Sequence, residues 1–131
     1  MYFTHSTAGH VLAYDYAPTG ELTNARVFYQ HADTDGPDGF RVDVDGNIWH
    51  AFYGGSCVLR ISPAGIVTGK INLPTRNITC VQFVGTELFI TTAWDPDAEG
   101  GERSRELGGA LFRVDVGTRG LDPFLFKLES V

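Results

Sequence analysis

Short apolar or alternating runs follow one another along the whole chain. They have the length of strands, are rich in β-branched and aromatic residues, and do not extend into the 3.6-residue stripe of a helix. The runs fall at residues 1–4, 10–16, 26–29, 40–44, 48–53, 57–61, 66–73, 78–84, 88–93, 110–116 and 123–128. This pattern predicts an all-β fold.

Glycine and proline mark the connections between these runs. Asp45-Gly46 lies between two of them and predicts a hairpin turn in which Gly46 takes a positive φ without steric cost. Further tight connections are expected at 18–20, 63–65 and 84–86. The long segment 94–107 is charged, contains glycine and has no periodicity, so we expect a mobile surface loop there.

One strand pattern recurs three times, as Met1–Thr4, Asn47–His50 and Glu87–Ile90, at steps of 46 and 40 residues. Each copy is followed by a second strand, a glycine-bearing turn and an outer strand, the outer strands being 22–29, 66–73 and 121–126. A period of about forty residues with four short strands per unit is typical of a β-propeller blade. The sequence therefore predicts one partial propeller domain over residues 1–131, with blades at approximately 1–31, 37–74 and 77–128.

The three predicted blades are not equally complete. The second and third each have four antiparallel strands, whereas the first begins at its second strand and lacks the inner one. A propeller buries both faces of each blade against its neighbours, so three blades leave two apolar faces and an unpaired edge exposed. We therefore expect either a fragment or a chain that pairs with a missing N-terminal half or with a second copy in a homodimer.

Composition narrows the choice of partners. The chain has 131 residues, 43% of them hydrophobic and 20% charged, which allows one modest core. Its net charge is −6, and an acidic surface repels phosphate backbones and anionic membranes. No apolar run reaches the length of a bilayer span, and no charged-then-apolar leader opens the chain. We expect no nucleic-acid or membrane partner, and a cytoplasmic location.

The cysteines, histidines and clustered aspartates offer few ligand patterns. Cys57 and Cys80 are too few for a disulfide framework, so two buried or half-buried thiols are expected, with a disulfide or nucleophile as the alternative. The four histidines have no HxxxH spacing, and His50, in mid-strand beside Trp49, is expected in the core. The acidic cluster of Asp33, Asp35 and Asp38 does not match an EF-hand and is expected to be a solvated turn.

A series of short motifs runs along the chain in a fixed order. It includes Met1–Ser6, 13–16, 19–22, Gly36-Pro37-Asp38-Gly39-Phe40, 46–49, 53–55, 71–74, 79–80, 108–112 and 117–120. In this order and spacing the series resembles the senescence-marker-protein/gluconolactonase family of sugar lactonases, whose most specific motif is similar to Pro37-Asp38-Gly39. The match runs from end to end of this chain but covers only about the C-terminal half of a family member. It implies about three blades of a six-bladed β-propeller.

The resemblance also implies an activity, the metal-dependent hydrolysis of a sugar lactone at the mouth of the propeller channel. It implies Asp38 as a metal ligand and catalytic residue, with one divalent cation whose identity among Ca²⁺, Zn²⁺, Mn²⁺ and Mg²⁺ stays open. A carboxylate on such a cation can activate water or take its proton. The family's other ligands, a Glu and an Asn, correspond to positions before Met1, and the family usually has Asp where His5 stands. The alternative is that Asp38 is a turn residue that caps backbone amides.

Propeller topology places several other connections at the same end as Asp38. On this basis the possible substrate-face residues are His5, Thr79, Cys80 and Trp94, and the segment 94–107 could act as a lid with Trp94 as an apolar wall. Packing for Cys80 and an inert surface position for His5 are the alternatives. At the level of function, the alternative to a lactonase is a non-catalytic propeller fragment or a self-associating half-ring.

Overall fold

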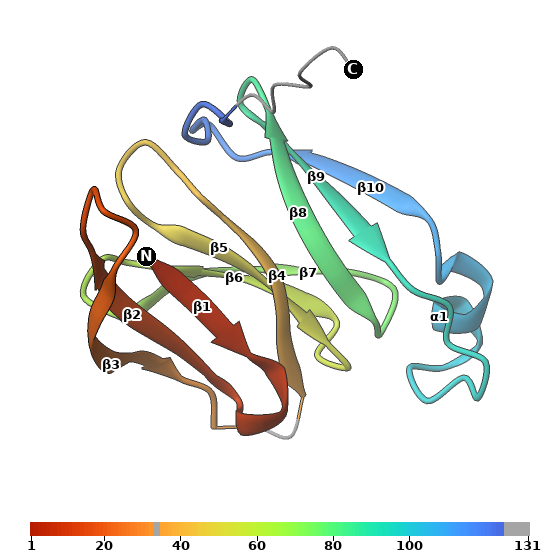
Figure 1. The fold of residues 1–131 in the computed structure, drawn as a ribbon. Coiled ribbons are helices and arrows are strands. Elements are labelled where there is room, and N and C mark those ends of the chain that lie inside the picture. The colour runs from red at the N-terminus through yellow and green to blue at the C-terminus, as the bar shows by residue number, and fades with distance from the viewer. Residues whose placement is uncertain (33–34, 125–131) are drawn as a thin grey trace, which may run out of the picture.

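The computed structural model describes residues 1–32 and 35–124, and nearly all of its regular elements are antiparallel strands (Figure 1). The first sheet has the order β1-β2-β3, the middle sheet β4-β5-β6-β7 and the third sheet β10-β9-β8. The strands are β1 Tyr2–His5, β2 His10–Tyr16, β3 Leu22–Gln30, β4 Gly36–Val42, β5 Ile48–Tyr53, β6 Cys57–Ile61, β7 Val67–Asn72, β8 Ile78–Val84, β9 Glu87–Thr92 and β10 Leu111–Asp115. Two short helices complete the elements, η1 at Ser6–Ala8 and α1 at Glu102–Leu107.

The all-β prediction is confirmed, and so is the turn at Asp45-Gly46. Gly46 has a φ of 82° and its N–H donates to the carbonyl of Asp43 over 3.0 Å. The antiparallel register that follows pairs Val42 with Ile48. A side chain in that conformation would be strained, which is why glycine stands at this point of the β4–β5 hairpin.

A buried carboxylate, which the sequence analysis did not single out, holds the same hairpin together. Asp43 is fully buried and accepts hydrogen bonds from the backbone N–H of Asp45 (3.0 Å) and of Asn47 (2.8 Å). The side-chain amide of Asn47 and the indole N–H of Trp49 donate to it over 2.9 Å each. Burial acts to raise the pKa of the Asp43 carboxyl, but the hydrogen bonds from Trp49 and Asn47 outweigh burial and hold the pKa below its usual value.

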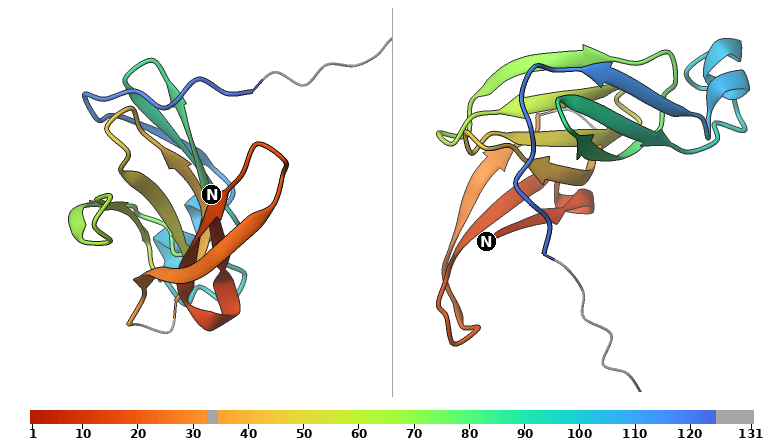
Figure 2. Two further views of the ribbon diagram at one scale, coloured as in Figure 1. Left: turned by 60° about the vertical axis from the view of Figure 1, so that its left-hand side comes forward. Right: turned by 90° about the horizontal axis from the view of Figure 1, so that it is seen from above.

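Strand β5 of the middle sheet is buried on both faces, because it presents apolar side chains to both neighbouring sheets. Ile48 and Phe52 pack with residues of the first sheet such as Val11, whereas Trp49 and Ala51 pack with the third sheet. Figure 2 shows the middle sheet between the other two. Every residue of β5 except Tyr53 is buried, which explains the unbroken apolar run in this part of the sequence.

The first sheet leaves one face uncovered within the described residues. In the first sheet, Phe3, Leu12 and Val27 occupy one row across the three strands. Phe3 is 49% exposed and Val27 58% exposed. Apolar side chains are therefore exposed on one face of this sheet.

The third sheet differs from the prediction of four strands. Its described part has three strands, and Leu121–Phe124 is not one of them; residues 125 and 126 of the predicted strand lie outside the described residues. Instead of following the outer edge of β10, the chain returns to the middle sheet, where Gly120 pairs with Asp43. The N–H of Leu121 donates to the carbonyl of Val42 over 3.0 Å. Pro123 has no N–H with which to extend this pairing.

The segment 94–107 also differs from the prediction of a mobile surface loop. Asp95 is buried, and its carboxylate accepts the backbone N–H of Glu99 over 3.3 Å. Arg76, in the connection to β8, pairs with Glu99 at 2.6 Å and donates its backbone N–H to the hydroxyl of buried Ser104 at 2.7 Å. These contacts fix the loop and its helix α1 against Arg76. The segment is therefore ordered by side-chain contacts, although its sequence has no periodic pattern.

Three smaller expectations also have an outcome. Cys57 is buried and Cys80 is half-buried, as predicted. Asp35 does not lie in a solvated turn: its side chain is 16% exposed and pairs with His31 at 3.0 Å, while Asp33 lies outside the described residues. Among the residues described, no helix is both long and apolar enough to cross a membrane.

Candidate functional site

Asp38 lies on β4, where the pairing of β4 with β5 is interrupted by a register shift between Pro37 and Phe40. The side chain is half-buried, and burial raises the pKa of its carboxyl. The carboxylate receives no hydrogen bond from the residues that the structure describes, so it does not cap backbone amides there. Asp38 is therefore a carboxylate that is more basic than usual and is not used by the fold around it.

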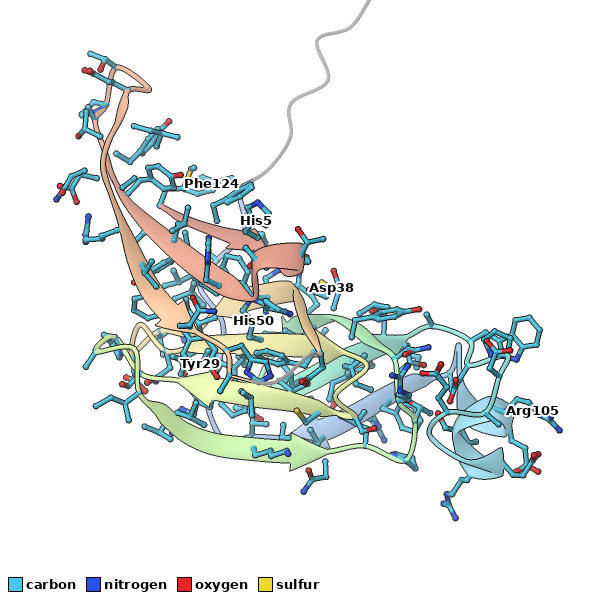
Figure 3. All side chains as sticks on the ribbon, turned by 90° about the horizontal axis from the view of Figure 1, so that it is seen from below. His5, Tyr29, Asp38, His50, Arg105 and Phe124 are labelled. Carbon is cyan, nitrogen blue, oxygen red and sulfur yellow. The ribbon has the colours of Figure 1, made fainter. Side chains whose placement is uncertain are left out.

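Two cavities meet at Asp38. One, of about 500 Å³, lies along β4 and is also lined by Thr4 and Gln82. The other, of about 300 Å³, is lined by Ser6, Thr7 and Tyr53. Figure 3 shows Asp38 close to the end of β1 and the η1 turn, on the same side of the molecule as His5. A small polar molecule in either cavity would reach the carboxylate.

The glycine that follows Asp38 lets two sheets approach each other. A Cβ atom placed on Gly39 would lie 2.5 Å from the Sγ of Cys80 and 2.8 Å from the carbonyl oxygen of Thr79. The inner strands β4 and β8 are side by side at this point (Figure 1). Thr79 and Cys80, both predicted on the substrate face, therefore lie beside Gly39, the residue after Asp38. The hydroxyl of Thr79 is in a 2.8 Å hydrogen bond with the hydroxyl of Thr91.

The other two predicted substrate-face residues are placed differently. His5 is exposed at the end of β1, where its Nδ1 accepts the backbone N–H of Ala8 over 3.3 Å and so caps η1. Trp94 is 63% exposed and lines neither of the cavities beside Asp38. Its carbonyl accepts the side-chain amide of Asn77 over 3.0 Å. Neither residue lines a cavity beside Asp38, although His5 lies on the same side of the molecule as Asp38 (Figure 3).

A charged residue that the sequence analysis missed also lines the larger cavity. Arg41 is an exposed residue of β4, and its Nε donates to the Oε1 of Gln82 on β8 over 3.0 Å. Its Nη1 donates to the carbonyl of Phe40 over 2.8 Å. The sequence gives little signal for it, because Arg41 occupies one of the two charged positions, with Asp43, of the alternating run at 40–44.

Asp38 does not by itself make a metal site. Within the described ranges 1–32 and 35–124, no three His, Cys, Asp or Glu side chains are grouped so that they could hold a metal ion. A hard divalent cation such as Ca²⁺ takes six to eight oxygen ligands, of which one carboxylate supplies one or two. Asp38 can be one ligand of a cation, and the remaining ligands have to come from elsewhere.

The family whose sequence model matches this chain is described as SMP-30/Gluconolactonase/LRE-like region, and the match covers residues 1–94. Pentonolactonase XacC of Haloferax volcanii is 38% identical over 95% of this chain and 46% of its own length. Human regucalcin is 34% identical over 96% of this chain and 44% of its own length. The chain therefore spans about half the length of the curated relatives it matches.

Solved structures agree with this relationship. A luciferin-regenerating enzyme superposes with a TM-score of 0.86 at 28% identity, over 98% of this chain and 45% of its own. A calcium-binding protein, regucalcin from Agrobacterium tumefaciens, gives a TM-score of 0.84 at 26% identity, over 97% of this chain and 45% of its own. The order of motifs around Asp38, the family match and the shared fold lead to one conclusion: this chain belongs to the SMP-30/gluconolactonase/LRE-like family.

Proposed function

We propose that this chain forms about half of a six-bladed propeller that hydrolyses a sugar lactone with the help of a divalent cation, and that it supplies only part of the active site. The single observation that carries the proposal is Asp38, a half-buried carboxylate that lines two cavities and has no role in the surrounding hydrogen bonds. The names of the relatives, which include a pentonolactonase and an L-arabinolactonase, support a sugar lactone as substrate.

Hydrolysis of a lactone adds water to the carbonyl carbon and breaks the ring C–O bond, which gives an open-chain hydroxy acid. In this proposal the cation polarises the carbonyl when it is bound. Asp38 would contribute a ligand oxygen and accept a proton from the attacking water, and this proton then passes to the ring oxygen as the C–O bond breaks. The other ligands come from a partner that completes the ring, because no three His, Cys, Asp or Glu side chains among the described residues are grouped so that they could hold a metal ion.

The test is lactone hydrolysis by the chain mixed with the N-terminal half of a family member, which would supply the rest of the ring. Acid release from D-glucono-δ-lactone is measured with and without added Ca²⁺, Zn²⁺ or Mn²⁺. We expect cation-dependent turnover that is lost in Asp38→Asn and kept in Asp15→Asn. Asp15 is a matched control, because it is an exposed carboxylate on β2 that pairs with Arg26 away from both cavities. Turnover equal to that of buffer at every cation concentration would remove the proposal for this chain.

A second candidate function is a non-catalytic half-ring that associates with a second copy. The row of exposed Phe3, half-buried Leu12 and exposed Val27 on the first sheet favours this candidate. Two copies of three sheets each would close a ring, with two equivalent junctions. Sedimentation equilibrium tests it: a dimer has twice the chain mass of 14.3 kDa, and a monomer at high concentration contradicts self-association.

A further inference from the structure

Arg41 is a charged group in the 500 Å³ cavity beside Asp38 that the proposed hydrolysis does not use. Its two hydrogen bonds, to Gln82 on β8 and to the carbonyl of Phe40, hold the guanidinium in one place between the middle and third sheets. The other N–H donors of the guanidinium, including both on Nη2, have no partner among the residues that the structure describes. An oriented cation with unused donors therefore faces the cavity.

The anchor of Arg41 is itself fixed. The Oε1 of Gln82 accepts the Nε of Arg41 and also the backbone N–H of Phe83, at 3.0 and 3.1 Å. Both bonds go to the same oxygen, so the orientation of the Gln82 amide is determined. A guanidinium held in this way loses little conformational entropy when it binds a ligand.

We propose that Arg41 binds the carboxylate of a sugar acid in this cavity. A planar guanidinium with free N–H groups matches a carboxylate in a bidentate arrangement, which a single ammonium group does not. Thr4 and Asp122, which line the same cavity, are polar groups suited to the hydroxyls of such a ligand. The inference rests on the proposed function, since the acid is the product of lactone hydrolysis and the lactone itself lacks the carboxylate. Arg41 is thus a product-binding residue.

Two carboxylates in the cavity, Asp38 and Asp122, work against an anionic ligand. A cation bound at Asp38 would cancel one of these charges, and so would the substitution Asp38→Asn. The substitution has the advantage that binding can be measured without a metal and without catalysis. We therefore expect sugar acids to bind more tightly to Asp38→Asn than to the parent chain.

The experiment is an NMR titration of D-gluconate into ¹⁵N-labelled Asp38→Asn, which follows the amide signals of Gly39, Arg41 and Gln82. We expect saturable shifts at these amides, and at least tenfold weaker binding when Arg41→Gln or Arg41→Lys is added. Arg26→Gln, added to the same background, is the matched control, because Arg26 is an exposed arginine paired with Asp15 on the first sheet. D-Glucitol carries a CH₂OH group in place of the carboxylate and is otherwise the same, so it should bind without dependence on Arg41.

The proposal is overturned if D-gluconate does not bind to Asp38→Asn, if it binds equally to the Arg41 variants, or if D-glucitol binds as tightly. The variant Gln82→Leu adds a check on positioning: it keeps the charge of Arg41 and removes its anchor, and weaker gluconate binding is expected. The two hypotheses fail separately. If gluconate binding depends on Arg41 but no lactone is hydrolysed, the proposed hydrolysis is wrong and the Arg41 site stands. If turnover depends on Asp38 but gluconate binding does not depend on Arg41, the hydrolysis stands and the Arg41 site is wrong.

Discussion

Thr4 on β1 and His50 on β5 are joined by a 2.9 Å hydrogen bond across the contact between the first and middle sheets. His50 is fully buried, as its position beside Trp49 in the sequence predicted. Its Nδ1 lies 3.0 Å from the carbonyl of Ala51, which only accepts, so Nδ1 carries the proton. The neutral ring then accepts the Thr4 hydroxyl at Nε2. Phe40 stacks on the same ring with centroids 5.4 Å apart.

The first prediction is that stability falls as the pH is lowered from about 6.5 to about 4. Burial lowers the pKa of His50 to about 4 from its ordinary value of 6.5, and the nearby His31 acts in the same direction. Between these pH values the unfolded chain binds a proton at His50 that the folded chain does not bind. The free energy of unfolding therefore decreases as the pH is lowered. The difference between the two pKa values corresponds to a loss of roughly 3 kcal/mol of unfolding free energy as an upper limit. Urea unfolding at pH 7, 5.5 and 4.5 measures it.

The control for this prediction is His50→Phe, which removes the titrating group and leaves an aromatic ring. We expect the pH dependence between 6.5 and 4 to shrink by most of its value in this variant. A curve that keeps its full slope would show that another group is responsible.

The second prediction concerns the hydrogen bond itself. Thr4→Val keeps the shape of the side chain and removes the hydroxyl, which leaves Nε2 of His50 buried without its donor. We expect a loss of about 1–3 kcal/mol of unfolding free energy at pH 7. Thr7→Val is the comparison, because the Thr7 hydroxyl bonds an exposed partner, His5, over 3.3 Å. Equal effects of the two substitutions would contradict the importance of the buried bond.

The third prediction is that Asp43→Asn is strongly destabilising. The substitution removes the charge that receives the Asn47 and Trp49 donors and places an NH₂ group among them. We expect a loss of about 3 kcal/mol or more at pH 7. The pKa of Asp43 is lowered from 3.8, so its contribution is complete above that value and is lost as the pH falls through the folded pKa. The two proteins should therefore converge in stability at strongly acidic pH, which thermal unfolding followed by circular dichroism can check.

Several of these features follow from the sequence, and others do not. The period-two runs, the Asp45-Gly46 turn and the buried position of His50 depend on local residue types, which is why they could be predicted. The course of the chain after β10 depends on a pairing between Gly120 and Asp43, which are distant in sequence. The ordered segment 94–107 depends on contacts of Asp95 and Ser104 with particular backbone N–H groups. Such long-range and side-chain anchors leave no periodic signal.

Part of the candidate site could also be predicted from the sequence, and part could not. The motif around Asp38 lies on β4, and Thr79 and Cys80 on β8 lie beside it because β4 and β8 are neighbouring strands. Trp94 was expected there on the basis of loop placement alone, and the anchored loop keeps it away. Arg41 was missed because its role depends on Gln82, which belongs to another sheet.

The last prediction is that Gly39→Ala destabilises the contact between β4 and β8. The new methyl group would lie 2.8 Å from both the Cβ of Cys80 and the carbonyl oxygen of Thr79, so the two strands have to move apart. We expect a cost of about 1–3 kcal/mol, the usual range for overpacking. Gly69→Ala on β7 is the matched control, because its added methyl group meets nothing closer than 3.5 Å. Chemical denaturation compares the two, and Gly39→Ala/Cys80→Ala should recover part of the loss because the second change removes the sulfur from the clash. A Gly39→Ala protein as stable as Gly69→Ala would show that the glycine after Asp38 is not needed for the approach of the two sheets.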